Sequence, residues 1–232
     1  MAKLRYFPKK HVYYYGRKKL ESVTTFVGRF FKPFNAREIA RKLAKFKANK
    51  DKKHGVKYFL KEWKESADHG TRVHQLLEGY IKFKVVPEDV QECDLPKFEQ
   101  GIYWVNKNLE VNSRVQPEVK VFDETLGLAG TIDLVITNND GTVTLVDWKT
   151  NRDIKTKGYN GEKAKEPLEM DDCSYNKYNL QLSTYAYILE HKYNTQVKDL
   201  ILVHLLEDNH GEYQLPYLKE EVKKMLEVKE WK

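Results

Sequence analysis

Two apolar, β-branched runs separated by a short turn constrain the fold of this chain more than any other feature. The runs cover residues 128–136 and 142–149, and the residues between them are Thr137-Asn-Asn-Asp-Gly141. Asparagine, aspartate and glycine are the residues that hairpin turns favour. The pattern therefore predicts two antiparallel strands in the middle of the chain.

Each of these strands carries charged side chains within an otherwise apolar run. Side chains alternate along a strand, so Asp147 and Lys149 are expected on one face of the second strand. Asp133 lies in the first strand, and a buried carboxylate needs a cation or hydrogen bonds to offset its lost hydration. A hard cation held by such carboxylates can activate water for phosphodiester cleavage. The alternative is an ordinary Asp–Lys ion pair on the surface of a sheet.

The segments Gly130-Thr-Ile-Asp133 and Asp147-Trp-Lys149 resemble the core motif of the PD-(D/E)xK nuclease superfamily. The resemblance is to its RecB-type exonuclease branch, including stand-alone members such as the mitochondrial genome maintenance exonuclease. Three more segments resemble that branch in the same order, and the matches together span roughly residues 66 to 187: His69 to Glu78, Pro117-Glu118, and Gln181 to Tyr185. The resemblance implies an α+β fold with a restriction-endonuclease-like core, a mixed central sheet flanked by helices, and a basic helical N-terminal layer.

The resemblance also implies roles for particular residues. It implies Mg²⁺ or Mn²⁺ as the cofactor, with Lys149 as the catalytic lysine. The metal ligands that it implies are His74, Asp133, Asp147 and the backbone carbonyl of Trp148. Further site residues implied in the same way are Glu118, Gln181 and Tyr185.

Three of these residues also have plain structural interpretations. His74 lies beside an apolar helical stripe, where a partly buried structural histidine is common. A strand glutamate such as Glu118 is usually solvated or paired with a neighbouring lysine. Gln181 and Tyr185 fall four residues apart on an apolar helical stripe that would ordinarily pack in the core. A glutamine there needs a polar partner, and an active site would provide one.

The charge of the chain is divided unevenly along its length. Residues 1–64 hold 20 Lys and Arg against 4 Asp and Glu, a net charge of +16, whereas the remainder holds 21 against 30, a net charge of −9. Cations interleaved with aromatic rings suit single-stranded nucleic acid, because bases stack on rings while lysines follow the backbone. The alternatives are a solvated lysine-rich face and rings that belong to the core. The rings in question are Tyr6, Phe7, Tyr13, Tyr14, Tyr15, Phe26, Phe30, Phe31, Phe34, Phe46, Tyr58, Phe59 and Trp63.

We expect a single nuclease domain over residues 1–232, in which residues 1–65 form a basic helical extension that contacts DNA and residues 66–232 form the core. Asn35 and Glu38 predict the capped start of a helix over residues 36–48, and a second helical run over 58–64 leads into the helix that carries His74. The resulting helical layer, residues 20–84, could form an arch over a threaded strand. Residues 151–176 form a long polar connection, expected to be a mobile substrate-side loop or disordered.

Several function classes are excluded or disfavoured by what the sequence lacks. The two cysteines, Cys93 and Cys173, are too few for a four-cysteine iron-sulfur cluster, and without a phosphate-binding loop any helicase or replication motor must be a separate partner. No apolar run approaches the roughly 20 residues of a membrane span, and the N-terminus lacks the apolar core of a secretory signal, so we expect an intracellular, cytoplasmic protein. A nucleoid and a viral replication site are both open as its place of action. His204 and His210 are expected to be structural or exposed.

The function expected from these observations is a metal-dependent DNA exonuclease that acts on single-stranded ends in replication, recombination or repair. One alternative is a structure-specific or nicking DNA endonuclease with the same site. The other is a nucleic-acid-binding module that keeps the fold without catalysis.

Overall fold

The described part of the chain contains one mixed sheet of eight strands. The computed structural model describes residues 3–7, 12–46, 49, 52–109 and 114–230. The strand order is β1-β2-β3-β5-β6-β7-β8, and β4 pairs with β5 off this path. The strands are β1 Leu4–Phe7, β2 Val12–Tyr15, β3 Lys18–Ser22, β4 Arg114–Asp123, β5 Leu128–Thr137, β6 Val143–Lys149, β7 Val197–Leu205 and β8 His210–Leu215.

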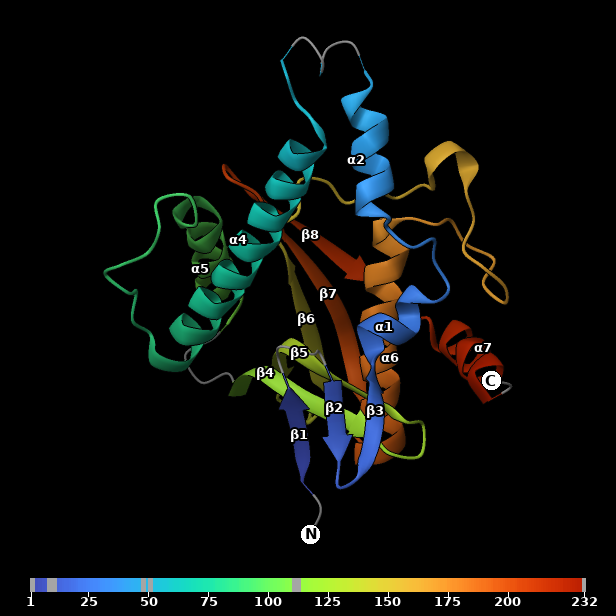
Figure 1. The fold of residues 1–232 in the computed structure, drawn as a ribbon. Helices are drawn as coiled ribbons and strands as arrows, with labels where there is room; N and C mark the ends of the chain where they lie inside the picture. Colours follow the sequence, from blue (N-terminus) through green and yellow to red (C-terminus); the bar gives the residue numbers. More distant parts are fainter. Residues whose placement is uncertain (1–2, 8–11, 47–48, 50–51, 110–113, 231–232) are drawn as a thin grey trace.

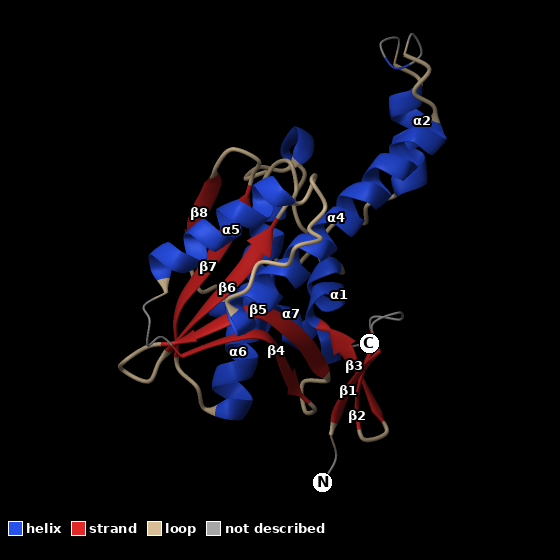
Figure 2. Ribbon diagram, turned by 90° about the vertical axis from the view of Figure 1, so that its left-hand side faces the viewer, coloured by secondary structure: helices blue, strands red, loops and turns tan. Residues whose placement is uncertain are grey.

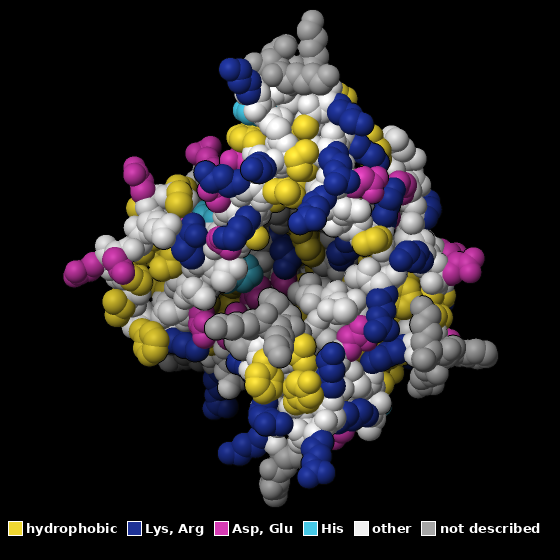
Figure 3. Space-filling view, viewed as in Figure 1, with side chains coloured by type: hydrophobic (Ala, Val, Ile, Leu, Met, Phe, Trp, Pro, Cys, Tyr) yellow, Lys and Arg dark blue, Asp and Glu magenta, His cyan; other side chains and the backbone are white. Residues whose placement is uncertain are grey.

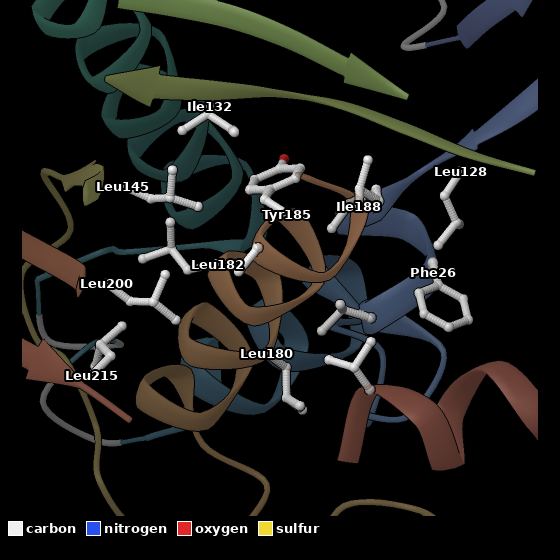
Figure 4. Packing of buried hydrophobic residues seen from close by; sticks show 14 of the residues in the cluster. Phe26, Leu128, Ile132, Leu145, Leu180, Leu182, Tyr185, Ile188, Leu200 and Leu215 are labelled. Carbon is white, nitrogen blue, oxygen red and sulfur yellow. The ribbon is translucent and has the colours of Figure 1, made fainter. Parts of the chain in front are cut away.

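Helices cover both faces of the sheet (Figure 1). One apolar cluster joins α4 and α5 to one face of the sheet through Val146 and Trp148 of β6. A second cluster joins α1, α6 and α7 to the other face through Val143 and Leu145, and Figure 4 shows the α6 side chains that enter it. The helices are α1 Val23–Gly28, α2 Ala36–Ala44, α4 Val56–Phe83, α5 Leu95–Asn108, α6 Ser174–Tyr193 and α7 Lys219–Glu230, with a 3-10 turn, η2, at Tyr159–Gly161.

The predicted fold class, α+β with a mixed sheet between helices, is confirmed. The predicted hairpin is β5 and β6, which pair antiparallel, and the alternation expected along β6 is present. Leu145 packs on the α6 side of the sheet while Val146 and Trp148 pack on the α4 side. Asp147 and Lys149 therefore share the α6 side with Leu145.

The sheet forks at the N-terminal half of β5. β5 pairs with β6 from Leu134 to Thr137, and with β3 at Leu128 and Ala129. Between these two pairings, residues 130–133 have no ladder partner on that edge among the described strands. The expected motif Gly130 to Asp133 thus lies in the opening of the fork.

The prediction of a purely helical N-terminal extension is wrong for residues 4–7, 12–15 and 18–22, which form strands β1, β2 and β3. The run Val12-Tyr-Tyr-Tyr15 has β-branched and aromatic residues that favour a pleated surface, and Gly16, with φ of 59°, makes the turn into β3. Charged residues elsewhere obscured this strand pattern, namely Arg5 in β1 and Lys18 and Lys19 in β3. Helical structure begins at α1, where the side chain of Ser22 accepts a hydrogen bond from Thr25 N.

Helix α2 and the start of α4 project together from the body of the molecule (Figure 2). The predicted cap is present, since Asn35 Oδ1 accepts a hydrogen bond from Glu38 N at 3.2 Å. The helix ends at Ala44, earlier than predicted, and residues 47–48 of the prediction lie outside the described residues. The two helical runs expected after Gly55 are one continuous helix, α4, of 28 residues.

The connection from β6 to α6 corrects a second expectation, because residues 151–176 have a defined conformation. Lys165 N donates a hydrogen bond to Phe30 O at 2.7 Å, and Lys32 N donates to the Asp172 carboxylate at 2.7 Å. These bonds hold the loop against the end of α1. Its polar composition suggested mobility, but long-range contacts that composition does not reveal fix its position. No helix among the described residues is long and apolar enough to cross a membrane.

Candidate functional site

The carboxylate of Asp133 lies at the opening of the fork between β5 and β6. Its Oδ2 accepts a hydrogen bond from the backbone N–H of Trp148 at 2.9 Å. This bond satisfies a donor that has no ladder partner on β5, because the β5–β6 pairing ends at Leu134 and Val146, two residues before Trp148. A side chain therefore replaces a backbone acceptor at the point where the strands separate, and the acid is held at the edge of the sheet.

Glu118 lies directly across from Asp133. The register of β4 and β5 pairs Pro117 with Leu134 and Val119 with Ile132, so Glu118 faces Asp133 at the position where the ladder is interrupted. Glu118 also has a left-handed backbone, with φ of 54°. This conformation is costly for a residue with a side chain, and such residues concentrate at functional sites. Burial, and then the charge of Asp133, raise the pKa of Glu118.

Helix α4 brings His74 to this pair of acids. His74 Nδ1 lies 3.5 Å from Asp133 Oδ2. One turn earlier, a Cβ added to Gly70 would lie 2.7 Å from Thr150 Oγ1, so the absence of a side chain allows α4 to approach the end of β6 closely. Burial opposes protonation of His74, but the Asp133 carboxylate outweighs it and raises the pKa of the imidazole.

His74, Glu118 and Asp133 form a group that could hold a metal ion, since one ligand atom from each lies within 4.8 Å of the others. Two carboxylates and an imidazole are donors that suit Mg²⁺ or Mn²⁺. The two acids repel one another, as the raised pKa of Glu118 indicates, and a cation would remove that repulsion. The residues therefore fit a divalent ion on both donor chemistry and charge.

Asp147, which is buried, and Lys149, which is partly buried, form a pair beside this group. Asp147 Oδ2 contacts Lys149 Nζ, although among the described residues it accepts no hydrogen bond of good geometry. Asp147 Oδ1 accepts a hydrogen bond from Gln181 Nε2 at 3.1 Å. Burial raises the pKa of Asp147 to about 6, with Asp133 adding to the effect and Lys149 opposing it.

The structure thus arranges the expected ligands differently from the sequence prediction. Asp133 and His74 lie together as expected. Among the described residues, Glu118 is the third member of their ligand group, whereas Asp147, a predicted ligand, lies next to the group and is not part of it. The position of Glu118 along β4 could have identified it as a ligand, because a residue directly opposite Asp133 on the neighbouring strand lies on the same face of the sheet as Asp133. The backbone of Trp148 reaches Asp133 through its N–H.

The two residues of the Gln181–Tyr185 motif have different surroundings. Gln181 has the polar partner that its place in an apolar stripe required, namely Asp147. Tyr185 is 3% exposed and its ring packs against Gly130 beneath the fork, within the core (Figure 4). In this conformation Tyr185 supports the floor of the site and does not reach its surface.

Two further tyrosines line the cleft. Lys149 Nζ lies over the ring of Tyr178 at 4.7 Å from its centre. Tyr6 of β1 stacks on Tyr13 with ring centres 4.5 Å apart, and the Tyr13 hydroxyl lies 3.0 Å from Thr131 Oγ1. No local pattern singled out Tyr6 among the N-terminal rings, because its strand was not predicted.

These groups open into a cleft of about 830 Å³. In Figure 3 the molecule is hollowed near its centre, with acidic and histidine side chains inside and Lys and Arg side chains around the upper rim. The lining residues of the cleft are Tyr6, Ser66, Ala67, Gly70, Thr71, His74, Gln75, Glu78, Glu118, Trp148, Lys149, Thr150, Asn151 and Tyr178.

A second group with metal-ligand chemistry lies outside the cleft. His69, Cys93 and Asp94 also place ligand atoms within 4.8 Å of one another. However, Arg72 already donates two hydrogen bonds to the buried Asp94 carboxylate, at 2.6 and 2.9 Å, and His69 Nδ1 lies 2.5 Å from it. A guanidinium thus neutralises this acid, and the cluster ties α4 to the start of α5.

His204 and His210 have partners outside the metal-ligand groups, as the sequence analysis expected. His204 is buried, and its Nε2 lies 2.5 Å from Asn151 O, near the end of β6. His210 Nδ1 lies 3.2 Å from the Gln100 side chain.

Comparison with protein-family models identifies the family to which the sequence belongs. Residues 45–231 match the model of the PD-(D/E)XK nuclease superfamily. No curated protein sequence matches the chain significantly. Two solved structures are similar at low identity. The protein SSO0001 is 17% identical, the match covers 91% of this chain and 75% of that one, and the TM-score is 0.40. A protein of Eubacterium rectale provisionally named an exonuclease is 14% identical, the match covers 69% of this chain and 64% of that one, and the TM-score is 0.43. Because both TM-scores are below 0.5, the family assignment rests on the sequence match.

Proposed function

Because this chain belongs to the PD-(D/E)XK nuclease superfamily and is a nuclease, we propose that it is a divalent-metal-dependent exonuclease acting on the ends of single-stranded DNA. The observation that carries the proposal is the convergence of His74, Glu118 and Asp133 next to the Asp147–Lys149 pair. A nucleic-acid-binding module without catalysis has no need to place Glu118, Asp133, Asp147 and Lys149 together in partly or fully buried positions, because burying a charge is costly.

His74, Glu118 and Asp133 would hold Mg²⁺ or Mn²⁺, with Asp147 and the Trp148 carbonyl as further candidate ligands. When bound, the ion neutralises charge on the phosphate and lowers the pKa of a water molecule. Asp133 is prepared for this role, because the hydrogen bond from Trp148 N fixes the direction of its carboxylate. Glu118 is held towards it by its left-handed backbone.

Lys149 acts as the catalytic lysine in this proposal. Burial disfavours its charged form, but Asp147 and then Asp133 outweigh burial and raise the pKa of the ammonium. Lys149 therefore stays protonated and donates to a phosphate oxygen or to the attacking water, where a fixed positive charge lowers the barrier. Gln181 positions Asp147, and Tyr178 supports the lysine from below.

The N-terminal residues contribute the contact with the strand. The proposed division is a DNA-contacting extension, residues 1–65, on a core of residues 66–232. Exposed rings accompany the projecting pair α2 and α4: Phe34 and Phe46 flank α2, and Tyr58 lies in the first turn of α4, in a segment rich in Lys and Arg. By contrast, Tyr13, Phe26, Phe30 and Phe31 are buried and serve the fold. Exposed rings with cations suit a single strand, and the projecting pair forms the proposed arch beside the cleft.

The RecB-type resemblance supports a role in replication, recombination or repair, with any helicase supplied by a separate protein. It also supports action from strand ends, as in the stand-alone exonucleases of that branch. A nicking or structure-specific endonuclease would use the same residues on a different substrate.

The test incubates the protein with end-labelled linear single-stranded DNA and with a closed single-stranded circle, in Mg²⁺, Mn²⁺ or EDTA. We expect metal-dependent loss of the linear strand while the circle survives, and the label gives the polarity. A cut circle would replace the exonuclease with an endonuclease. Tight binding without cleavage in either metal would leave only a binding module.

A further inference from the structure

The loop between β6 and α6 is held firmly at the edge of the catalytic cleft. Lys155 N donates to Ser174 Oγ at 2.7 Å, and Tyr175 N donates to Lys155 O at 3.0 Å. These bonds join the first part of the loop to the start of α6. With the contacts of the later part to Phe30 and Lys32, they fix the loop at both ends.

This loop encloses a second pocket, of about 560 Å³, which we call the loop pocket. Tyr178 lines both the loop pocket and the catalytic cleft, so the two hollows adjoin at its ring. On the cleft side the same ring carries Lys149 Nζ. The lining residues of the loop pocket are Lys155, Lys157, Gly158, Tyr159, Asn160, Asp172, Cys173, Ser174, Lys177 and Tyr178.

The loop pocket is positively charged. Three lysines line it, and within the described residues neither Lys157 nor Lys177 forms an ion pair with a carboxylate. Lys177 Nζ lies over the Phe31 ring at 5.0 Å, and Lys155 pairs with the exposed Asp153 at 3.1 Å. The one acid among the lining residues, Asp172, already accepts the Lys32 N–H. That donor is uncharged, so Asp172 keeps its negative charge, but three lysines against one carboxylate leave the lining with an excess of positive charge that suits an anion.

An aromatic ring stands at the same pocket. Tyr159 is 77% exposed, the largest exposure among the large apolar side chains of the described residues. It begins the turn η2, in which Asn160 takes a left-handed backbone with φ of 51°. A strained turn that displays an uncovered ring next to lysines has the two features that bind a nucleotide, since the ring stacks on a base and the lysines bind phosphates.

We propose that the loop pocket binds the nucleotides of the single strand that adjoin the scissile phosphate, with Lys157 and Lys177 on backbone phosphates and Tyr159 stacked on a base. The strand passes from the cleft to the loop pocket over Tyr178. This inference rests on the proposed function, because the cleft must hold the scissile phosphate. The occupant is a nucleic-acid strand because the lysines match its phosphates and the ring matches its bases.

The first test measures binding of labelled oligothymidylate by fluorescence anisotropy in EDTA, so that cleavage does not interfere. We expect Tyr159→Ala to weaken binding by roughly tenfold, as for loss of one stacked base. The double variant Lys157→Ala/Lys177→Ala should bind with a weaker salt dependence. In a plot of log affinity against log salt concentration, we expect the magnitude of the slope to fall by about 0.7 for each phosphate that the variant no longer neutralises. The matched controls are Lys163→Ala, a loop lysine paired with Asp171, and Tyr103→Ala, a 58% exposed tyrosine on α5.

The second test places a photoreactive 5-iodouracil at successive positions of the strand. We expect a cross-link to Tyr159 from one or two adjacent positions, and none to Tyr103. The loop-pocket proposal alone would be overturned if the wild type binds the strand, the loop-pocket variants bind it equally well, and no cross-link to Tyr159 forms. Failure of the wild type to bind any single strand would overturn the proposed function as well.

Discussion

Gln181 Nε2 donates a hydrogen bond to Asp147 Oδ1 at 3.1 Å, and this bond links helix α6 to the strand that carries the acid. It occupies one oxygen of Asp147 and leaves the other, Oδ2, against Lys149. The amide thus determines which way the carboxylate faces. We infer that Gln181 is a positioning residue for the Asp147–Lys149 pair.

Replacement of this amide should impair the chemical step more than strand binding. For Gln181→Met, which keeps the volume, we expect kcat to fall by roughly 10- to 100-fold, the equivalent of about 1.5–3 kcal/mol for a hydrogen bond to a charged group. KM for the strand should change little, because phosphate contacts elsewhere carry affinity. The control is Gln214→Met, which removes the hydrogen bond of 2.8 Å from the Gln214 side-chain amide to Asp199. Neither residue lines the cleft. Equal kcat in both variants would exclude the positioning role.

Loss of the lysine or its partner should separate cleavage from binding. We expect Asp147→Asn and Lys149→Ala to abolish cleavage and to retain most of the affinity for single-stranded DNA, as measured by anisotropy in EDTA. Asp147→Asn should bind at least as tightly as the wild type, since it removes a negative charge that faces the phosphate. Full cleavage by either variant would show that the site lies elsewhere.

The position of Glu118 predicts an effect on metal affinity. Glu118→Gln removes one ligand charge, so we expect the Mn²⁺ concentration that half-saturates activity to rise by at least about tenfold. Without metal, the variant should be as stable as the wild type or more stable, because the repulsion with Asp133 is lost. Thermal melting with increasing Mn²⁺ measures both effects. Glu99→Gln, at an exposed position of α5, is the control, and an unchanged Mn²⁺ response in Glu118→Gln would remove Glu118 from the ligands.

The cluster of Arg72, His69 and Asp94 predicts how stability depends on pH. The hydrogen bond from Arg72 lowers the pKa of Asp94. Burial raises this pKa, but the hydrogen bond with His69 lowers it further, and the net shift is downward. Because the folded pKa is below the unfolded value of about 3.9, this stabilisation is present above that pH and is lost as pH falls through the folded pKa. We expect Asp94→Asn to lower the free energy of unfolding by about 1.5–3 kcal/mol at pH 7. In urea unfolding the difference should shrink towards pH 3, and a difference that is constant with pH would contradict the assignment.

The sequence predicted the parts of the site that depend on local alternation. Asp133, Asp147 and Lys149 were found on adjacent strands because the apolar runs and the turn between them are local signals. Gln181 was identified as a polar residue within an apolar stripe, and the structure gives it a carboxylate partner. The three N-terminal strands were missed because charged residues interrupt β1 and β3, and because β3 pairs with a strand more than 100 residues away.

The closeness of Glu118 to His74 could not be predicted from either segment alone. It depends on the register between β4 and β5, on the left-handed backbone at Glu118 and on the approach of α4 at Gly70. The order of the β6–α6 loop also depends on distant partners, such as the bond from Lys165 N to Phe30 O. Composition and periodicity are local properties of the chain and carry no signal of such long-range contacts.

The measurement that tests the account most directly locates the metal. Crystals of the Lys149→Ala variant, which keeps all the proposed ligands, would be grown with Mn²⁺ and a short oligothymidylate, and the anomalous signal of manganese would be mapped. The account predicts a peak in contact with His74, Glu118 and Asp133, next to a backbone phosphate. A peak at His69, Cys93 and Asp94 with none at the fork of β5 and β6 would contradict it.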